Sequence, residues 1–283
     1  MPSFDVHQHL LPEPLLRALR ARRERPRLAG SRLQTGEGEF ELDLRDHEVD
    51  RRLALLDRHE VDVALVSFPP TLGGDAAPEL LDAWHTGARE LVECSRGRLR
   101  ALASGAPREG FAGVCIAGRT LVEGGRHVDR LCEALLETGG VLFVHPGPAA
   151  PRAGAPSWWG PVVDYTAEMQ AAYGAWIARG ATAFPELRVI FAILAGGAPV
   201  QLERLRSRGV EVRSTLHPNV FFDTASYGRR ALELCLATYG VRQLVYGSDV
   251  PVVDPQPTLH ALADFGDAVA EAVRKENPSL LLG

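Results

Sequence analysis

The feature that most constrains the fold of this chain is a series of short apolar runs that recur from one end to the other. The runs are rich in β-branched residues and almost continuous in hydrophobicity, which is typical of strands in a parallel sheet covered on both faces. The eight candidate strands are residues 4–9, 61–68, 99–104, 113–118, 141–145, 187–193, 219–224 and 243–249.

Segments with helical periodicity lie between most of these runs. They are residues 48–59, 79–95, 128–138, 167–181, 231–240 and 263–275. Eight strand-then-helix units in 283 residues match the usual size of a (β/α)₈ TIM barrel, so we expect one α/β domain of this class over residues 1–283. A doubly wound open sheet is the alternative, but no glycine fingerprint follows the first strand.

Two connections depart from a regular barrel. Residues 10–46 form a long segment rich in arginine, proline and glycine, and we expect it to be a lid or mouth segment. Only residues 105–112 separate the third and fourth candidate strands, whereas a crossover helix normally needs about a dozen residues or more. The sequence therefore predicts a distorted barrel with a reduced third helix.

The composition excludes several kinds of partner. A formal net charge of −5 argues against a nucleic-acid binder and gives no attraction to an anionic membrane. No apolar run reaches the ~20 residues that span a bilayer, and the first residues lack a signal-peptide pattern. The cysteines form no C-x-x-C pair, so we expect free thiols in a reducing cytoplasm. The partner that we expect is a small-molecule substrate.

Two histidines lie two residues apart in the first candidate strand. Because side chains alternate along a strand, His7 and His9 point to the same side, which in a barrel is the interior near the C-terminal mouth. Neutral imidazoles suit a borderline cation such as Zn²⁺. The alternative is a pair of buried histidines that bind nearby carbonyl groups.

Two more metal-ligand types end strands of the same predicted barrel. His145 ends the fifth candidate strand and Asp249 the eighth, which neighbours the first in a closed barrel. Each has an ordinary alternative, since a histidine often hydrogen-bonds a carbonyl and an aspartate often caps a turn. Their shared placement predicts a His₃Asp metal site whose aspartate accepts a proton from activated water.

Several stretches resemble the amidohydrolase superfamily, in particular the group that includes aminocarboxymuconate-semialdehyde decarboxylase. They include DVHQHLLP (5–12), VLFVHPG (141–147), FPELRVIFAILAGGAP (184–199) and LVYGSDVP (244–251). The resemblance implies a distorted barrel with one divalent metal, most often zinc, with manganese or magnesium as alternatives. It also implies that His7, His9, His145 and Asp249 are the ligands and that Asp249 is catalytic. Since the only lysine, Lys275, lies outside every predicted strand, a two-metal site bridged by a carboxylated lysine is excluded.

One position departs from the family pattern A-H-L-G-G-x-x-P, because Ile193 stands where the histidine is expected. Alternation with Val189 and Phe191 predicts that Ile193 faces the barrel interior, and isoleucine transfers no protons. Three interpretations remain open. The protein is a hydrolase for which the metal and Asp249 suffice, an enzyme with altered chemistry in which His217 or another group supplies the proton, or a metal- or ligand-binding barrel that has lost catalysis. A non-oxidative decarboxylase of an aromatic or unsaturated acid is the alternative enzyme.

Three further residues are candidates for substrate binding. Trp158 and Trp159 follow the fifth strand, where a loop would overhang the mouth and wall a pocket for a flat or apolar substrate. The alternative for this pair is a cover for the barrel end or a subunit interface, for example in a homodimer. Arg51 lies before the second strand, near where relatives hold a substrate carboxylate.

The remaining reactive residue types have ordinary expectations. Cys115 is expected in the core rather than as a metal ligand. Asp223, at the end of the seventh strand, is expected to brace a ligand or to start a turn. The other histidines of the helices and loops are expected on the surface; they are His47, His59, His85, His127 and His260.

Overall fold

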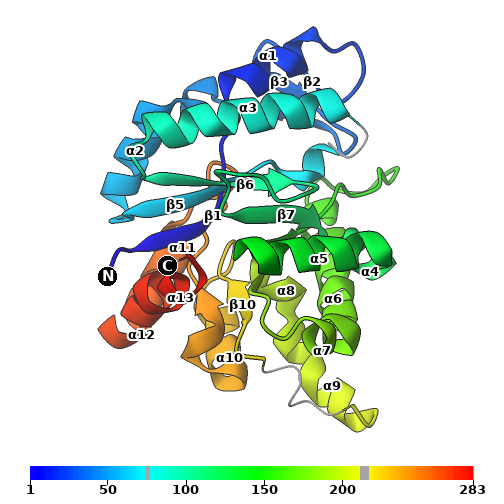
Figure 1. Ribbon diagram of the computed structural model, residues 1–283, viewed down its shortest axis with the longest axis vertical. Helices are drawn as coiled ribbons and strands as arrows, with labels where there is room; N and C mark the ends of the chain where they lie inside the picture. The colour runs from blue at the N-terminus through cyan, green and yellow to red at the C-terminus, as the bar shows by residue number, and fades with distance from the viewer. Residues whose placement is uncertain (74–76, 211–216, 283) are drawn as a thin grey trace.

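The structure is a computed structural model that describes residues 1–73, 77–210 and 217–282. Its centre is an eight-stranded parallel sheet in the order β1-β5-β6-β7-β8-β9-β10-β11 (Figure 1). The strands are β1 (Phe4–His9), β5 (Val63–Ser67), β6 (Leu99–Ser104), β7 (Gly113–Ala117), β8 (Val141–His145), β9 (Val189–Phe191), β10 (Val220–Asp223) and β11 (Leu244–Val245). Each lies within one of the eight predicted runs.

The ring of strands closes between β11 and β1. The backbone N–H of Val6 donates to the carbonyl oxygen of Tyr246 at 2.9 Å, and beyond β11 the N–H of Asp249 donates to the carbonyl oxygen of His7 at 2.8 Å. The N–H of His9 then donates to the carbonyl oxygen of Val250 at 2.9 Å. The predicted (β/α)₈ barrel is thus confirmed, and the open doubly wound sheet is excluded because both of its edges would stay unpaired.

Helices surround the barrel, and most lie at the predicted places. The exception is the predicted helix over residues 263–275, which is interrupted at Phe265 and Gly266 and is divided between two helices. The longer helices are α2 (Val49–Arg58), α3 (Pro78–Cys94), α5 (Arg126–Thr138), α6 (Tyr165–Ala175), α10 (Arg229–Tyr239) and α11 (Gln256–Asp264). Shorter segments are α4 (Gly118–Glu123), α7 (Ala181–Ala183), α8 (Ile193–Gly197), α9 (Leu202–Ser207), α12 (Asp267–Glu271) and α13 (Asn277–Leu282). Among the described residues, no helix is long and apolar enough to cross a bilayer.

The third crossover contains no helix, as predicted, and residues 105–112 run as a loop. A histidine of α3 stabilises this connection: the N–H of Ser104 donates to Nε2 of His85 at 3.0 Å, and the His85 ring packs edge-on against Phe111. The predicted surface position is therefore wrong for His85, which is 3% exposed, and for His47, which is 7% exposed. A ring nitrogen of each accepts a backbone N–H, which makes burial of the polar ring favourable.

The segment after β1 folds into α1 (Glu13–Ala21) and a three-stranded antiparallel sheet of β2 (Arg27–Ala29), β3 (Arg32–Gln34) and β4 (Glu39–Glu41). The start of this segment lies against α3, and a Cβ atom at Gly87 would come within 2.5 Å of the Pro12 ring. Glycine is therefore needed at this approach.

The turn between β3 and β4 is bound to the barrel mouth through one side chain. Oε1 of Glu37 accepts a hydrogen bond from the N–H of Ala149 at 2.7 Å, and Oε2 accepts one from the Tyr165 hydroxyl at 2.6 Å. Ala149 lies in the loop after β8, and Tyr165 opens α6. The predicted mouth segment thus reaches the end of the barrel at which β8 terminates.

The His85 contact predicts a pH dependence of stability. Burial lowers the pKa of His85 to about 4 from its ordinary 6.5, so the unfolded chain binds the proton first and the free energy of unfolding falls as pH drops through this window. In His85→Gln the amide oxygen still accepts from Ser104 but does not titrate. We expect this variant to lose about 1–3 kcal/mol less than wild type between pH 7 and about pH 4, measured by urea unfolding. The exposed His127→Gln is the control, and equal losses in wild type and His85→Gln would contradict the assignment.

Candidate metal centre

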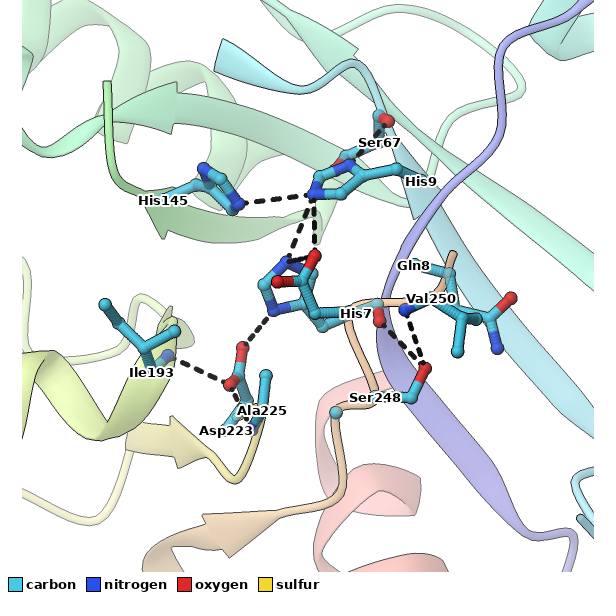
Figure 2. A network of polar contacts seen from close by, with 12 residues as sticks. His7, Gln8, His9, Ser67, His145, Ile193, Asp223, Ala225, Ser248 and Val250 are labelled. Carbon is cyan, nitrogen blue, oxygen red and sulfur yellow. Dashed lines mark hydrogen bonds and ion pairs between the residues drawn. The ribbon is translucent and has the colours of Figure 1, made fainter. Parts of the chain in front are cut away.

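Three imidazole rings converge inside the mouth of the barrel (Figure 2). His7 and His9 come from β1 and His145 from the end of β8, across the ring. The Nε2 atom of His9 lies 3.3 Å from Nε2 of His7 and 3.2 Å from Nε2 of His145. All three side chains are buried. The structure therefore brings together the three histidines that the sequence placed at strand ends.

The other ring nitrogen of each histidine faces an oxygen acceptor. Nδ1 of His7 lies 2.9 Å from Oδ2 of Asp223, Nδ1 of His9 lies 3.2 Å from the Ser67 carbonyl oxygen, and Nδ1 of His145 lies 2.8 Å from the Pro146 carbonyl oxygen. These acceptors favour the tautomer with the proton on Nδ1, which leaves a lone pair on Nε2. Three lone pairs that face one another repel unless a proton or a cation lies between them.

The fourth donor is a carboxylate oxygen. Oδ1 of Asp249 lies 3.5 Å from Nε2 of His7 and 3.4 Å from Nε2 of His9, and it is buried without a hydrogen-bond partner. One ligand atom from each of the four residues lies within 4.8 Å of the others. Imidazole nitrogens together with a carboxylate oxygen are a donor set that Zn²⁺ and similar cations accept. The residues present therefore fit a divalent metal.

The position of Asp249 depends on an uncommon backbone conformation. Its φ of +59° lies in the left-handed region, which aspartate tolerates better than most residues. The turn is held by the Asp249 N–H on the His7 carbonyl oxygen and by the Val252 N–H on the Asp249 carbonyl oxygen, at 2.8 and 2.9 Å. The carboxylate is thus anchored to the strand that carries two of the histidines.

Charge is unevenly distributed over the cluster. Burial alone would lower the pKa of His7, but the carboxylates of Asp223 and Asp249 outweigh it and raise that pKa to about 9. Burial, together with the neighbouring histidines, holds the pKa of His145 well below its ordinary value. For Asp249 the penalty of burial is outweighed by the three imidazoles, which lower its pKa. The cluster therefore attracts positive charge at the point where His7 and Asp249 meet.

Asp223 performs both of the roles expected for it. Its Oδ2 braces His7, and its Oδ1 accepts the backbone N–H groups of Ile193 and Ala225, each at 3.0 Å (Figure 2). One buried carboxylate thus orients a candidate ligand and fixes the turns after β9 and β10. Such bracing by a carboxylate typically strengthens metal binding.

Ile193 lies beside this carboxylate and is 9% exposed. Its position is not set by alternation along a strand, as the sequence suggested. β9 ends at Phe191, and residues 193–197 form a turn in which every φ is positive, with Ile193 at +47°. At Gly196 a Cβ atom would lie 2.3 Å from the Thr166 carbonyl oxygen, so only glycine is accommodated. A β-branched residue at positive φ is strained, and such strain is concentrated at functional sites.

A buried polar network along β1 was not expected from the sequence. Nη1 of Arg52 donates to Oε1 of Gln8 at 2.8 Å, and Nε2 of Gln8 donates to Oδ2 of Asp5 at 2.7 Å. Nη2 of Arg52 donates to the His9 carbonyl oxygen at 3.1 Å. The signal was available, because two non-histidine polar residues, Asp5 and Gln8, occupy a strand that is buried at every position.

The three predicted substrate-binding residues lie elsewhere. Trp158 is 55% exposed and stacks on the half-buried Trp159, over which the Arg152 guanidinium lies. Arg51 is exposed, forms an ion pair with Asp46 at 3.1 Å and lines a separate cavity beside α2. Among the described residues, no hydrogen bond, ion pair or ring contact joins these three side chains to the histidine cluster. Their role in substrate binding stays a prediction.

Two other expectations are settled by position. His217 precedes β10, at the end of that strand opposite Asp223, so it does not reach the mouth to supply a proton. Cys115 is 2% exposed and packs in the hydrophobic core, as expected.

The fold is similar to solved structures over almost its full length. IDCase from Metarhizium anisopliae, in apo form, is 20% identical with a TM-score of 0.79, covering 99% of this chain and 97% of that one. 2,6-Dihydroxybenzoate decarboxylase from Rhizobium is 14% identical with a TM-score of 0.74, covering 100% of this chain and 98% of that one. 5-Carboxyvanillate decarboxylase from Novosphingobium aromaticivorans is 16% identical with a TM-score of 0.73, covering 99% of this chain and 96% of that one. That structure is complexed with manganese and 4-hydroxy-3-methoxy-5-nitrobenzoic acid. At these identities the likeness concerns the fold.

A comparison with curated proteins found no match. The sequence profile of a family described as Amidohydrolase matches residues 4–283, from the first residue of β1 to the C-terminus. The matched range includes all four residues of the metal cluster and the Ile193 turn. This chain belongs to the amidohydrolase family.

Proposed function

We propose that the protein is a metal-dependent hydrolase that acts on a small organic substrate, aromatic or cyclic, through an activated water. The observation that carries the proposal is the convergence of three Nε2 lone pairs with an unpartnered, buried carboxylate oxygen at the barrel mouth. Catalytic groups of (β/α)₈ enzymes collect at this end of the barrel.

The proposed ligands are His7, His9, His145 and Asp249, and they would hold one divalent cation. Three imidazoles favour zinc. Manganese is the second candidate, because the related 5-carboxyvanillate decarboxylase structure contains it. When bound, such a cation supplies Lewis acidity, which lowers the pKa of water towards ~7 and polarises a carbonyl group.

The protein side chains would then direct the proton and the substrate. Asp249 has one oxygen at the cluster and remains ionised, so it can accept the proton of the attacking water and return it to the leaving group. Asp223 keeps His7 in the tautomer whose Nε2 faces the cluster. Ile193 contributes an apolar wall and exchanges no proton. Asp249 is therefore the only acid–base residue that this mechanism requires.

A second candidate is non-oxidative decarboxylation of an aromatic or unsaturated acid. This reaction is favoured because two of the similar structures are of decarboxylases, named for 2,6-dihydroxybenzoate and 5-carboxyvanillate. In this case Asp249 would take up a proton from solvent and pass it to the ring carbon, as the bond between that carbon and the carboxylate breaks and carbon dioxide leaves. The two candidate reactions differ in that hydrolysis consumes a water molecule, whereas decarboxylation releases carbon dioxide.

We further propose that residues 1–283 act as one domain in the cytoplasm. Trp158 and Trp159 would contact the apolar part of the substrate, with a homodimer interface as their alternative role. No substrate contact is proposed for Arg51, because it pairs with Asp46 and lines the cavity beside α2.

A substrate panel distinguishes the two reactions. We expect the zinc- or manganese-loaded protein to hydrolyse aryl esters or lactones, detected by acid release in a pH-stat, without release of carbon dioxide from hydroxybenzoic acids. Asp249→Asn should lose about 10²–10⁴-fold in rate because it accepts no proton. Carbon dioxide release that depends on Asp249, in the absence of hydrolysis, would replace the first candidate by the second.

The metal site itself is tested by metal content. We expect about one equivalent of metal in wild type and none in His9→Ala, measured by mass spectrometry of the purified protein. Asp223→Asn should weaken metal binding about 10–100-fold, because it removes the carboxylate that orients His7. The exposed His260→Ala is the matched control and should retain the metal. Equal metal content in all four proteins would contradict the proposal.

Ile193 offers a test of whether catalysis has been lost. If Asp249 already transfers the proton, Ile193→His should change the rate by less than about tenfold, because a second acid–base group is then redundant. Ile193→Asn is the control, since asparagine also tolerates positive φ but does not titrate. A gain of about 10²–10⁴-fold specific to histidine would show that the wild-type barrel lacks its acid–base group.

A further inference from the structure

The cavity beside α2 lies outside the barrel, between that helix and the turn that follows Asp249. Its volume is about 150 Å³, and its walls include Arg51, Arg52 and Arg58 of α2 together with Val250 and Pro251. Asp46 is the only carboxylate among its lining residues. Three guanidinium groups thus face one carboxylate and an apolar wall.

Arg52 is the unusual member of this set. Its side chain is 1% exposed, yet among the described residues it forms no ion pair. Its two terminal nitrogens donate to the neutral oxygens of Gln8, His9 and Asp46, the last two being backbone carbonyls. Its Nε is buried without a hydrogen-bond partner. A buried cation without a contacting anion is costly, and a ligand of negative charge would remove that cost.

The other two arginines differ in how far they are engaged. Arg51 forms ion pairs with Asp46 and Asp43 at 3.1 and 3.5 Å. Arg58 is exposed, and within the described part of the chain it has no ion pair or hydrogen bond. The exposed guanidinium of Arg58 and the buried one of Arg52 thus have no contacting carboxylate among the described residues.

The cavity is separate from the metal centre. Arg52 reaches the side chain of Gln8, which points to the opposite side of β1 from His7 and His9 because side chains alternate along a strand. None of the lining residues belongs to the metal cluster. A ligand here would therefore not be the molecule that is transformed at the mouth.

We propose that this cavity is a binding site for a small oxoanion, either inorganic phosphate or a carboxylate. The planar guanidinium group matches the oxygens of both in a bidentate manner. The cavity volume of about 150 Å³ leaves room for one such anion. The Val250–Pro251 wall and the apolar side of α2 exclude water on one side, which strengthens the charge interaction.

The experiment is a calorimetric titration of the purified full-length protein with inorganic phosphate and, separately, with acetate. We expect saturable 1:1 binding of at least one of them, and Arg58→Gln should weaken it about tenfold or more, because a charge-assisted contact is lost. Arg130→Gln, an exposed arginine of α5, removes the same charge elsewhere and should leave the affinity unchanged. Tighter binding of phosphate or of acetate identifies which oxoanion the site prefers.

Three outcomes would overturn the proposal: no saturable binding of either anion, equal weakening by Arg58→Gln and Arg130→Gln, or binding that survives Arg58→Gln but is lost in His9→Ala. The last result would place the anion at the metal centre. Because Arg58 is exposed, its replacement is not expected to impair folding, and an unchanged thermal unfolding transition confirms that the comparison is sound.

Discussion

The candidate metal centre depends on the closure of the strand ring between β11 and β1. Three backbone hydrogen bonds make this closure, and two of them join Asp249 and the following Val250 to His7 and His9. The same bonds that complete the barrel therefore set the distance between a carboxylate from the end of the chain and imidazoles from its beginning. A slip of one residue in this register would turn either the histidines or the aspartate away from the mouth.

Within the closed ring, backbone carbonyl groups and one carboxylate determine how the histidines present themselves. The carbonyl oxygens of Ser67 and Pro146 and the carboxylate of Asp223 each occupy an Nδ1 atom. Nε2 is thereby left as the free ligand atom on all three rings. These acceptors lie in β5, in β10 and directly after β8, so the strands of the barrel position the groups that orient the cluster.

Asp223 links this cluster to the position where the family pattern is broken. Because its second oxygen holds the N–H of Ile193, the left-handed turn of residues 193–197 is a part of the site even though its side chain there cannot transfer a proton. The strain of three non-glycine residues at positive φ, Ile193, Leu194 and Ala195, is retained in a chain that lacks the expected histidine. The left-handed turn is thus retained, while the proposed chemistry rests on Asp249.

The sequence by itself determined the eight strands, the missing third helix and the four residues of the candidate metal cluster, because strand burial and strand ends leave a local signature. It did not determine that His47 and His85 are buried, since their partners are backbone N–H groups 36 and 19 residues away. Nor did it determine the left-handed turn at Ile193, which depends on Asp223 and on the close approach of Thr166. The buried Arg52, with its contacts to β1, is of the same kind. In each case the deciding contact joins segments far apart in the chain, and only the closed barrel brings them together.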